Sequence, residues 1–107
     1  MCAGVERLQF EFEAGPSIGA FTPTVVGVVG SGNLEVLVEP RTDARCTVEV
    51  ETSARGFGSI WEAVVRDFHE RHPMVGVRLS INDMGATPAV VSLRLDQAIA
   101  QIDRRRQ

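Results

Sequence analysis

The feature that most restricts the fold of this chain is a strict alternation of apolar and polar side chains in several separate segments. Successive side chains of a β-strand point to opposite faces of a sheet, so a period of two indicates half-buried strands. The clearest segments cover residues 8–13, 34–39, 46–51 and 77–82. Their apolar side chains of one parity are Leu8, Phe10, Phe12, Leu34, Val36, Val38, Cys46, Val48, Val50, Val77, Leu79 and Ile81. These segments are therefore predicted to form a sheet with one apolar and one polar face.

Two other segments have the spacing of amphipathic helices, in which apolar side chains recur every three or four residues. The first is predicted from about Gly58 to His72, where Pro73 stops it. Its apolar stripe consists of Ile60, Trp61, Val64, Val65 and Phe68. The second begins at Thr87 and Pro88, residue types that suit an N-cap and a first helical position. Its apolar positions are Val91, Leu95, Ala98 and Ile102, although residues 91–95 also alternate like a strand.

Several strands followed by a helix, a strand and a helix are typical of an α+β domain with two layers. We therefore expect a mainly antiparallel sheet of four to five strands, with two helices packed on one face. A chain of 107 residues buries roughly two-thirds of its unfolded surface, so one modest core is expected. Residues 1–107 are predicted to form a single domain, with residues 1–6 and 103–107 as frayed ends.

Composition and charge limit the class of function. Hydrophobic residues make up 44% and charged residues 23% of the chain, as in ordinary globular domains. The net charge is −3 and the pI about 5.3, which argues against a nucleic-acid partner because phosphate binding needs a basic surface. The triplet Arg104–Arg106 fits the last turn of a helix, where cations favour the negative end of the dipole.

The location of the protein is also bounded by the sequence. No apolar run approaches the length needed to cross a bilayer, and residues 1–10 lack the pattern of a signal peptide. We therefore expect a cytoplasmic protein that does not cross a membrane.

The chain has two cysteines, Cys2 and Cys46. They are too few for a disulfide framework or a zinc site, and Cys46 is expected to be a small core residue.

The polar face of the predicted sheet is strongly acidic. Its glutamates are Glu11, Glu13, Glu35, Glu39, Glu49 and Glu51. A face of this kind is usually solvated, while a partner surface is the less common alternative. The sequence leaves both readings open.

Several patterns that resemble catalytic motifs do not fit. His69 and His72 lie three residues apart with no evident third ligand, whereas zinc proteases space their histidines four apart. A serine hydrolase would need its nucleophile at a strand-to-helix elbow. The glycines match neither a phosphate loop nor a dinucleotide fingerprint. These residues therefore give no support to an independent catalyst.

One serine stands between two glycines at the tip of a predicted hairpin, in the segment VVGVVGSGNLEVLVEP of residues 25–40. From the residues alone, Gly30-Ser31-Gly32-Asn33 is a turn in which the glycines supply positive φ and the serine is a small polar residue. A serine whose neighbours have no side chains is also sterically bare. Another enzyme could therefore close around its hydroxyl and modify it.

This turn belongs to a wider resemblance. The segments Val29–Leu37, Asp83–Val91 and Leu93–Ala98 resemble the acyl carrier (delta) subunit of malonate decarboxylase, and the likeness covers about Leu8 to Ile102. The segment Asp83–Ala86 and the helix after it are similar, more distantly, to the carrier subunit of citrate lyase. Asn33 stands where that family is expected to have aspartate, which removes a charge and leaves the serine in place.

The resemblance implies a specific function. Ser31 would carry a phosphodiester-linked 2′-(5″-phosphoribosyl)-3′-dephospho-coenzyme A arm, attached by a prosthetic-group transferase and loaded by a malonyl transacylase. The thiol of that arm would hold acetyl and malonyl groups between the transferase (alpha) and decarboxylase (beta and gamma) subunits, in the net conversion of malonate to acetate and carbon dioxide. Gly30, Gly32 and Asn33 would form the flanking turn. Asp83 and Gly85 would have a structural or docking role, with Gly85 in a backbone conformation closed to other residues.

Two other classes of function stay open at this point. The chain could be an unmodified interaction subunit of a multienzyme complex, with Ser31 an ordinary turn residue and the acidic face a docking surface. It could also be a stand-alone enzyme of unknown chemistry. The first would show no added mass in its native host, and the second would show turnover without any other subunit.

Overall fold

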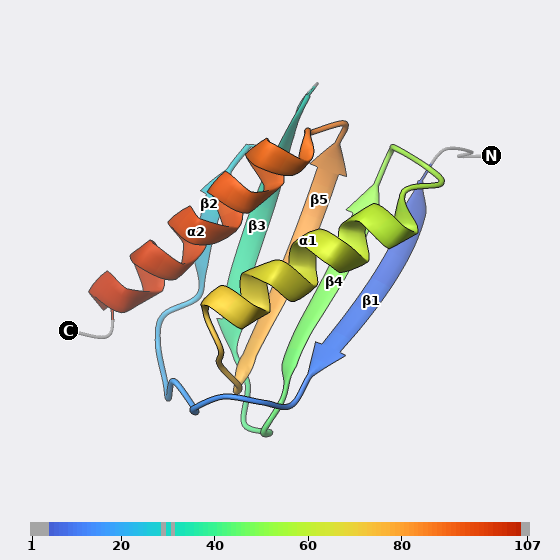
Figure 1. The fold of residues 1–107 in the computed structure, drawn as a ribbon. Helices are drawn as coiled ribbons and strands as arrows, with labels where there is room; N and C mark the ends of the chain where they lie inside the picture. Colours follow the sequence, from blue (N-terminus) through green and yellow to red (C-terminus); the bar gives the residue numbers. More distant parts are fainter. Residues whose placement is uncertain (1–4, 29, 31, 106–107) are drawn as a thin grey trace.

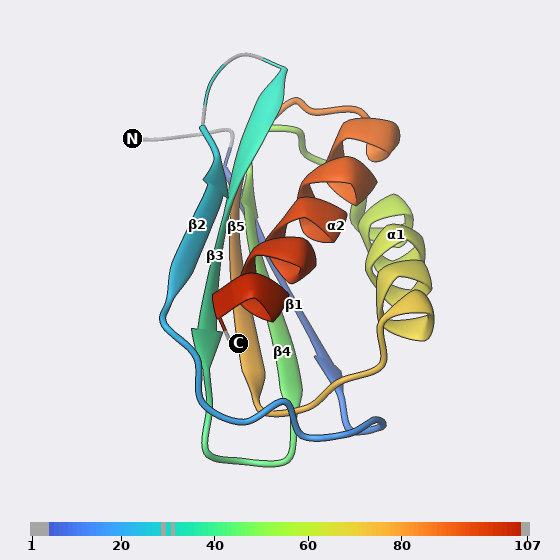
Figure 2. The same ribbon diagram turned by 90° about the vertical axis from the view of Figure 1, so that its left-hand side faces the viewer.

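The structure, a computed structural model, describes residues 5–28, 30 and 32–105. Five strands and two helices follow one another in the described chain. They are β1 (Glu6–Phe12), β2 (Thr24–Gly27), β3 (Asn33–Pro40), β4 (Cys46–Thr52), α1 (Gly58–Arg71), β5 (Val77–Met84) and α2 (Pro88–Arg105). Both helices lie on the same face of the sheet, so the molecule has two layers (Figures 1 and 2). The predicted α+β class is confirmed.

The sheet has the strand order β1-β4-β5-β3-β2. All adjacent pairs are antiparallel except β4 and β5, which run parallel with Cys46 opposite Val77. Parallel neighbours require a crossover connection, and α1 supplies it. β2 and β3 form the predicted hairpin, with Thr24 opposite Val38 and Gly27 opposite Glu35.

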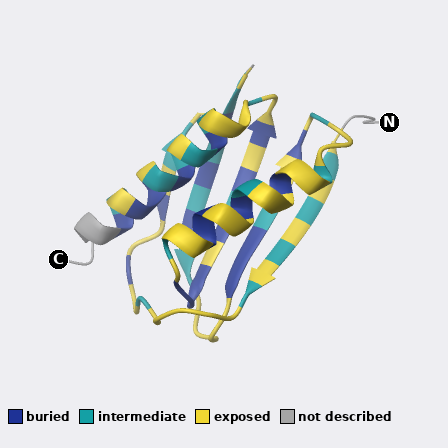
Figure 3. Cartoon of the chain, in the orientation of Figure 1, coloured by how far each residue is buried: buried dark blue, intermediate teal, exposed yellow. Residues whose placement is uncertain are grey.

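The core lies between the sheet and the helices, where the apolar parity of the strands is buried (Figure 3). The central strands contribute Leu34, Val36, Val38, Cys46, Val48, Val50, Val77, Leu79 and Ile81, and α2 contributes Val91, Leu95, Ala98 and Ile102. Each of these side chains is at most 3% exposed. The apolar side chains that alternation predicted to share one face are therefore the buried ones in these central strands.

Helix α1 departs from the predicted stripe at two positions. Ile60 is 44% exposed and does not belong to the core, whereas His69 is buried. The ring of His69 stacks on Phe12 at a centroid distance of 4.4 Å, and its Nε2 lies 3.0 Å from the carbonyl oxygen of Met74. His69 thus ties the end of α1 to β1 and to the segment that enters β5, a packing role that its place in the last helical turn did not predict.

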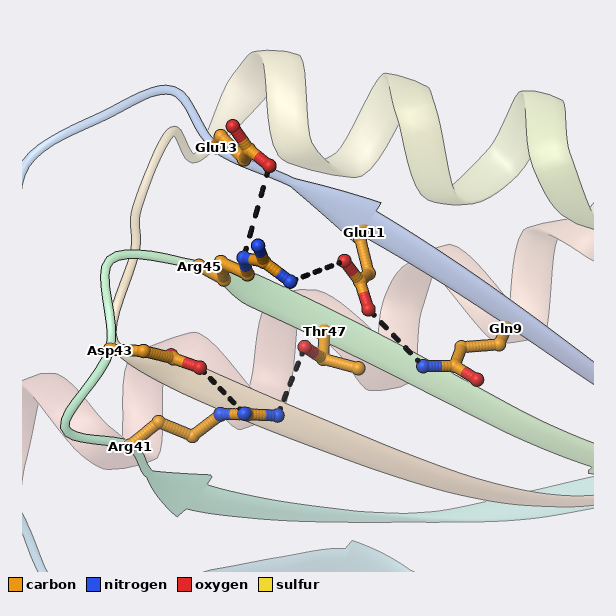
Figure 4. Close-up of polar contacts among 7 residues, drawn as sticks. All are labelled: Gln9, Glu11, Glu13, Arg41, Asp43, Arg45 and Thr47. Atoms are coloured by element: carbon orange, nitrogen blue, oxygen red, sulfur yellow. Dashed lines mark hydrogen bonds and ion pairs between the residues drawn. The ribbon is translucent and has the colours of Figure 1, made fainter.

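The acidic face of the sheet is open, and several of its glutamates have arginine partners. Arg78 contacts Glu49 at 2.8 Å and Arg7 contacts Glu51 at 3.4 Å. Beyond the end of β1, Arg45 lies between two further glutamates, and Arg41 bonds to Asp43 and Thr47 (Figure 4). The negative charge predicted for this face is therefore partly neutralised within the molecule.

The two ends of the described chain extend into segments that were expected to fray. β1 includes Glu6, whose carboxylate accepts a hydrogen bond of 3.1 Å from the backbone N–H of Gly56. Helix α2 continues to Arg105. None of the helices in residues 5–28, 30 and 32–105 is long and apolar enough to span a membrane.

Candidate functional site

The candidate site is the loop between β2 and β3, together with the backbone that supports it. The carbonyl oxygen of Gly30 accepts a 2.9 Å hydrogen bond from the N–H of Asn33, which closes a tight turn. The N–H of Gly32 donates to the carbonyl oxygen of Met84 at 2.7 Å. Gly32 has a φ of 72°, a conformation that glycine adopts without strain, whereas the positive φ predicted for Gly30 is wrong. Ser31, the predicted attachment residue, lies outside the described residues.

The two glycines beside Ser31 are in open space. A Cβ atom placed on Gly30 or on Gly32 would have no other heavy atom within 4 Å. The side of each glycine on which a side chain would project is therefore unobstructed, although the backbone of Gly32 is bonded to Met84.

A single arginine reaches the base of the loop from α2. The Nε of Arg94 donates to the Oδ1 of Asn33 at 3.2 Å, and its Nη1 donates to the Oε1 of Gln97 at 2.9 Å. Its side chain also lies against Gly27, where an added Cβ would come within 3.2 Å of the Cδ of Arg94. Both acceptors are neutral amides, and no described carboxylate forms an ion pair with Arg94. Its positive charge is thus left uncompensated beside the loop.

Asp83 organises the chain at the same end of the sheet. Its carboxylate accepts hydrogen bonds from the hydroxyl of Thr52 at 2.8 Å and from the backbone N–H groups of Gly85 at 3.2 Å and Ala86 at 3.0 Å. The side chain is buried. Asp83 therefore acts as a structural anchor that fixes the connection between β5 and α2.

Gly85 and Thr87 complete that connection. Gly85 has a φ of 84°, so the predicted special backbone conformation is confirmed. The hydroxyl of Thr87 accepts a 3.3 Å hydrogen bond from the N–H of Val90, as expected of an N-cap residue. The supporting residues of the two sequence motifs, Asn33 and Asp83–Thr87, are thus gathered at one end of the molecule (Figures 1 and 2).

A cavity of about 250 Å³ lies at this end, between the N-terminal parts of the two helices. Its lining is mostly apolar and comprises Ala54, Phe57, Ile60, Trp61, Val64, Asp83, Gly85, Ala86, Thr87, Pro88 and Val91. The sequence did not reveal this cavity, because its walls come from two helices and two loops that are distant in sequence. The one available signal was Phe57, an aromatic residue directly before a helix where a polar cap is usual.

The thiol of Cys46 is protected in the core. Burial raises the pKa of the Cys46 thiol to about 12, which keeps it protonated and unreactive near neutral pH. Within the described residues, no three His, Cys, Asp or Glu side chains come together as a set of metal ligands.

Comparisons with known proteins agree with this arrangement. The family described as the malonate decarboxylase delta subunit matches residues 22–102. A malonate decarboxylase acyl carrier protein of Burkholderia cepacia is 68% identical over 99 residues, covering 92% of each chain. Another from Stenotrophomonas maltophilia is 54% identical over 100 residues, covering 89% of this chain and 92% of the relative.

A solved structure is similar over nearly the whole fold. It is part of a Pseudomonas malonate decarboxylase hetero-tetramer in complex with malonate, with a TM-score of 0.82 and 39% identity, and the match covers 91% of this chain and 98% of the other. These comparisons, together with the fold, place the protein in the class of acyl carriers built on an open α+β sheet. The chain belongs to the malonate decarboxylase delta subunit family, the acyl carrier proteins of that enzyme.

Proposed function

We propose that this protein carries acyl groups on a prosthetic arm attached to Ser31, and that it does so without catalysing a step itself. The observation that carries the proposal is the open turn: Gly30 and Gly32 flank the serine and have no heavy atom near their missing Cβ positions. Modification by a separate transferase would join the hydroxyl oxygen of Ser31 to the phosphorus of a precursor activated as a polyphosphate ester. The phosphoanhydride bond of that precursor would break, its outer phosphates would leave as pyrophosphate, and the hydroxyl proton would be released. The membership of the family supports this assignment.

The arm implied by the family is 2′-(5″-phosphoribosyl)-3′-dephospho-coenzyme A, and one described residue suits its phosphate. Its link to the serine would be an anionic phosphodiester, and Arg94 places an uncompensated cation at the base of the same loop. A guanidinium suits phosphate because its planar donors match the phosphate oxygens. We therefore assign Arg94 as the counter-charge of the linkage. When bound, the arm would supply the thiol that forms acyl thioesters.

Three other residues of the site hold the loop in position. Asn33 closes the turn and positions Arg94, while Asp83 and Gly85 fix the neighbouring strand end that bonds to Gly32. Tethering raises the local concentration of the acyl group at each partner active site to the order of millimolar. The partners would be the transferase (alpha) and decarboxylase (beta and gamma) subunits of a cytoplasmic complex that converts malonate to acetate and carbon dioxide, with malonyl transacylase loading the arm.

The proposal is tested by intact mass spectrometry after coexpression with the modifying enzymes of the native host. Wild-type protein should gain the mass of the arm, and Ser31→Ala should not. Ser53→Ala is the control, because Ser53 is an exposed serine in another loop, and this variant should be modified like wild type. In a reconstituted complex, Ser31→Ala should fold and assemble normally but abolish acetate release from malonate.

The outcomes separate the proposal from its rival. Acetate release that survives in Ser31→Ala would refute the attachment assignment. Wild-type protein with no added mass would instead favour an unmodified interaction subunit.

A further inference from the structure

Phe57 occupies a position that folding alone does not explain. It is the N-cap residue of α1, its side chain makes no capping hydrogen bond, and it is 46% exposed. Polar residues that bond to the first free N–H groups are preferred at this position because they stabilise the helix. Ile60, one turn further along, is also exposed. Two large apolar side chains are therefore held at the surface at one helix end, without burial in the core.

Both side chains line the cavity between the helices. The cavity also includes Trp61, which is 5% exposed and forms part of the core. The polar side chains of the lining are those of Asp83 and Thr87, and the carboxylate of Asp83 is held by its three donors. An apolar cavity with aromatic walls suits a flat aromatic ring that stacks through its face and keeps its polar edge toward the solvent.

The cavity adjoins the candidate attachment loop through the backbone. Gly32, which follows Ser31 in the sequence, donates its N–H to the carbonyl oxygen of Met84 at 2.7 Å. The next two residues after Met84 are Gly85 and Ala86, and both line the cavity. A group attached close to Ser31 is therefore within reach of the cavity along a short stretch of described backbone.

The chemistry of the arm supplies one suitable group. In a 2′-(5″-phosphoribosyl)-3′-dephospho-coenzyme A arm, adenosine is separated from the serine by only the phosphodiester and one ribose, whereas the thiol lies at the far end. Nucleobases stack on aromatic side chains irrespective of their sequence context. We propose that the cavity lined by Phe57, Ile60 and Trp61 binds the adenine of the arm, an inference that rests on the function proposed above.

Binding of this kind would fix the base of the arm and leave its thiol end free to reach the partner subunits. It does not need high intrinsic affinity, because a tether provides an effective concentration on the order of millimolar. A dissociation constant of about 1 mM for the free base would already populate the bound and released states comparably.

The test uses Ser31→Ala protein, so that no arm can be attached, and free 3′-dephospho-coenzyme A as the probe. Trp61 is the single tryptophan of the chain, and its fluorescence can be excited at wavelengths where adenine does not absorb. We expect saturable quenching with half-saturation at about 1 mM. Phe57→Ala in the same background should raise the half-saturation about tenfold, the scale of one base–aromatic stack. Pantetheine, which lacks adenine, should cause no saturable change.

Leu93→Ala is the matched control, because Leu93 is 51% exposed on α2 but does not line the cavity. It should bind the probe like the parent protein. Absent quenching, equal quenching by pantetheine, or quenching unaffected by Phe57→Ala would each overturn the proposal. So would a Phe57→Ala protein that binds the probe normally but loses affinity for another subunit, since the cavity would then be a protein docking site.

The same set of measurements keeps this inference separate from the attachment assignment. The titration depends on free ligand and not on Ser31. A wild-type protein without added mass but with saturable quenching in the Ser31→Ala background would refute attachment and leave adenine recognition standing. Added mass without quenching would support attachment and refute adenine recognition by the cavity.

Discussion

At the scale of single residues, Gly85 shows how one backbone conformation sets the position of a helix. Its φ of 84° turns the chain from β5 toward the N-cap of α2, yet a Cβ atom at this position would meet no heavy atom within 4 Å. Any cost of substitution therefore comes from the backbone and not from a clash. This separation makes the position a clean test of conformational strain.

We expect Gly85→Val to lower the free energy of unfolding by about 1–3 kcal/mol, the scale of a side chain held in a sparsely populated backbone region. Urea denaturation measures it. Gly30→Val is the control, since Gly30 is equally unobstructed but its φ is not positive, and it should stay within about 0.5 kcal/mol of wild type. Equal stability of the two variants would show that Gly85 has no special backbone role.

Cys46 allows a second prediction at this scale. Burial raises the pKa of its thiol from 9.0 to about 12, so the folded protein holds this proton more tightly than the unfolded chain. Stability should therefore fall as pH rises from about 9 toward 12, because the unfolded state then binds fewer protons. In a Cys2→Ser background, iodoacetamide should leave native Cys46 unmodified at pH 8 and label it in urea. Rapid labelling of the native protein would contradict the buried, protonated thiol.

At the scale of secondary-structure elements, the start of α2 depends on Thr87. Its hydroxyl accepts the N–H of Val90. Thr87→Ala should lower the free energy of unfolding by about 0.5–2 kcal/mol, the usual cost of removing an N-cap. Thr22→Ala, at an exposed loop position, is the control and should have little effect. A loss no larger than that of the control would mean that the cap does not stabilise this helix.

The strands and the first helix show which parts of the fold the sequence could predict. Alternation identified the buried faces of β3, β4 and β5 because one side of each strand packs against the helices and the other is less buried, apart from Thr47 of β4. It could not give the strand order or the parallel pairing of β4 with β5, since alternation reveals which face is buried and not which strand is adjacent. Ile60 was misassigned for a related reason: helical spacing places it beside the core stripe, but the edge of that stripe lies open at the cavity.

The candidate site combines residues that are contiguous in the sequence with a residue that only the fold brings beside them. The turn residues Gly30, Gly32 and Asn33 are contiguous, so a sequence motif could reveal them. Arg94 contacts Asn33 across 61 positions of sequence, and only the packing of α2 beside the hairpin brings them together. A lone arginine on a helix has no pattern that marks it as a neighbour of a particular loop.

At the scale of the whole molecule, the two layers separate the regions that could meet partners. The loop between β2 and β3 and the start of α2 lie at one end of the sheet, and both helices lie on one of its faces (Figures 1 and 2). The cavity is lined by residues of that same end, and the glutamates lie on the face opposite the helices. Arginines within the molecule already neutralise part of that face. An exposed loop beside a rigid sheet can therefore be offered to different active sites while the rest of the fold stays unchanged.

The absorbance of the whole molecule gives a final prediction about the arm. The chain has one tryptophan and no tyrosine, so its own ultraviolet absorbance is weak. An arm that contains adenine should therefore add a distinct band at wavelengths shorter than that of tryptophan, whereas a phosphopantetheine arm would add no nucleobase band. The measurement compares wild-type protein from its native host with Ser31→Ala prepared in the same way. Release of the arm should yield an adenine-containing fragment with a thiol that is alkylated only after deacylation. An arm on Ser31 without the adenine band would refute the proposed prosthetic group and, with it, the occupant of the cavity, while a carrier role on Ser31 would still stand.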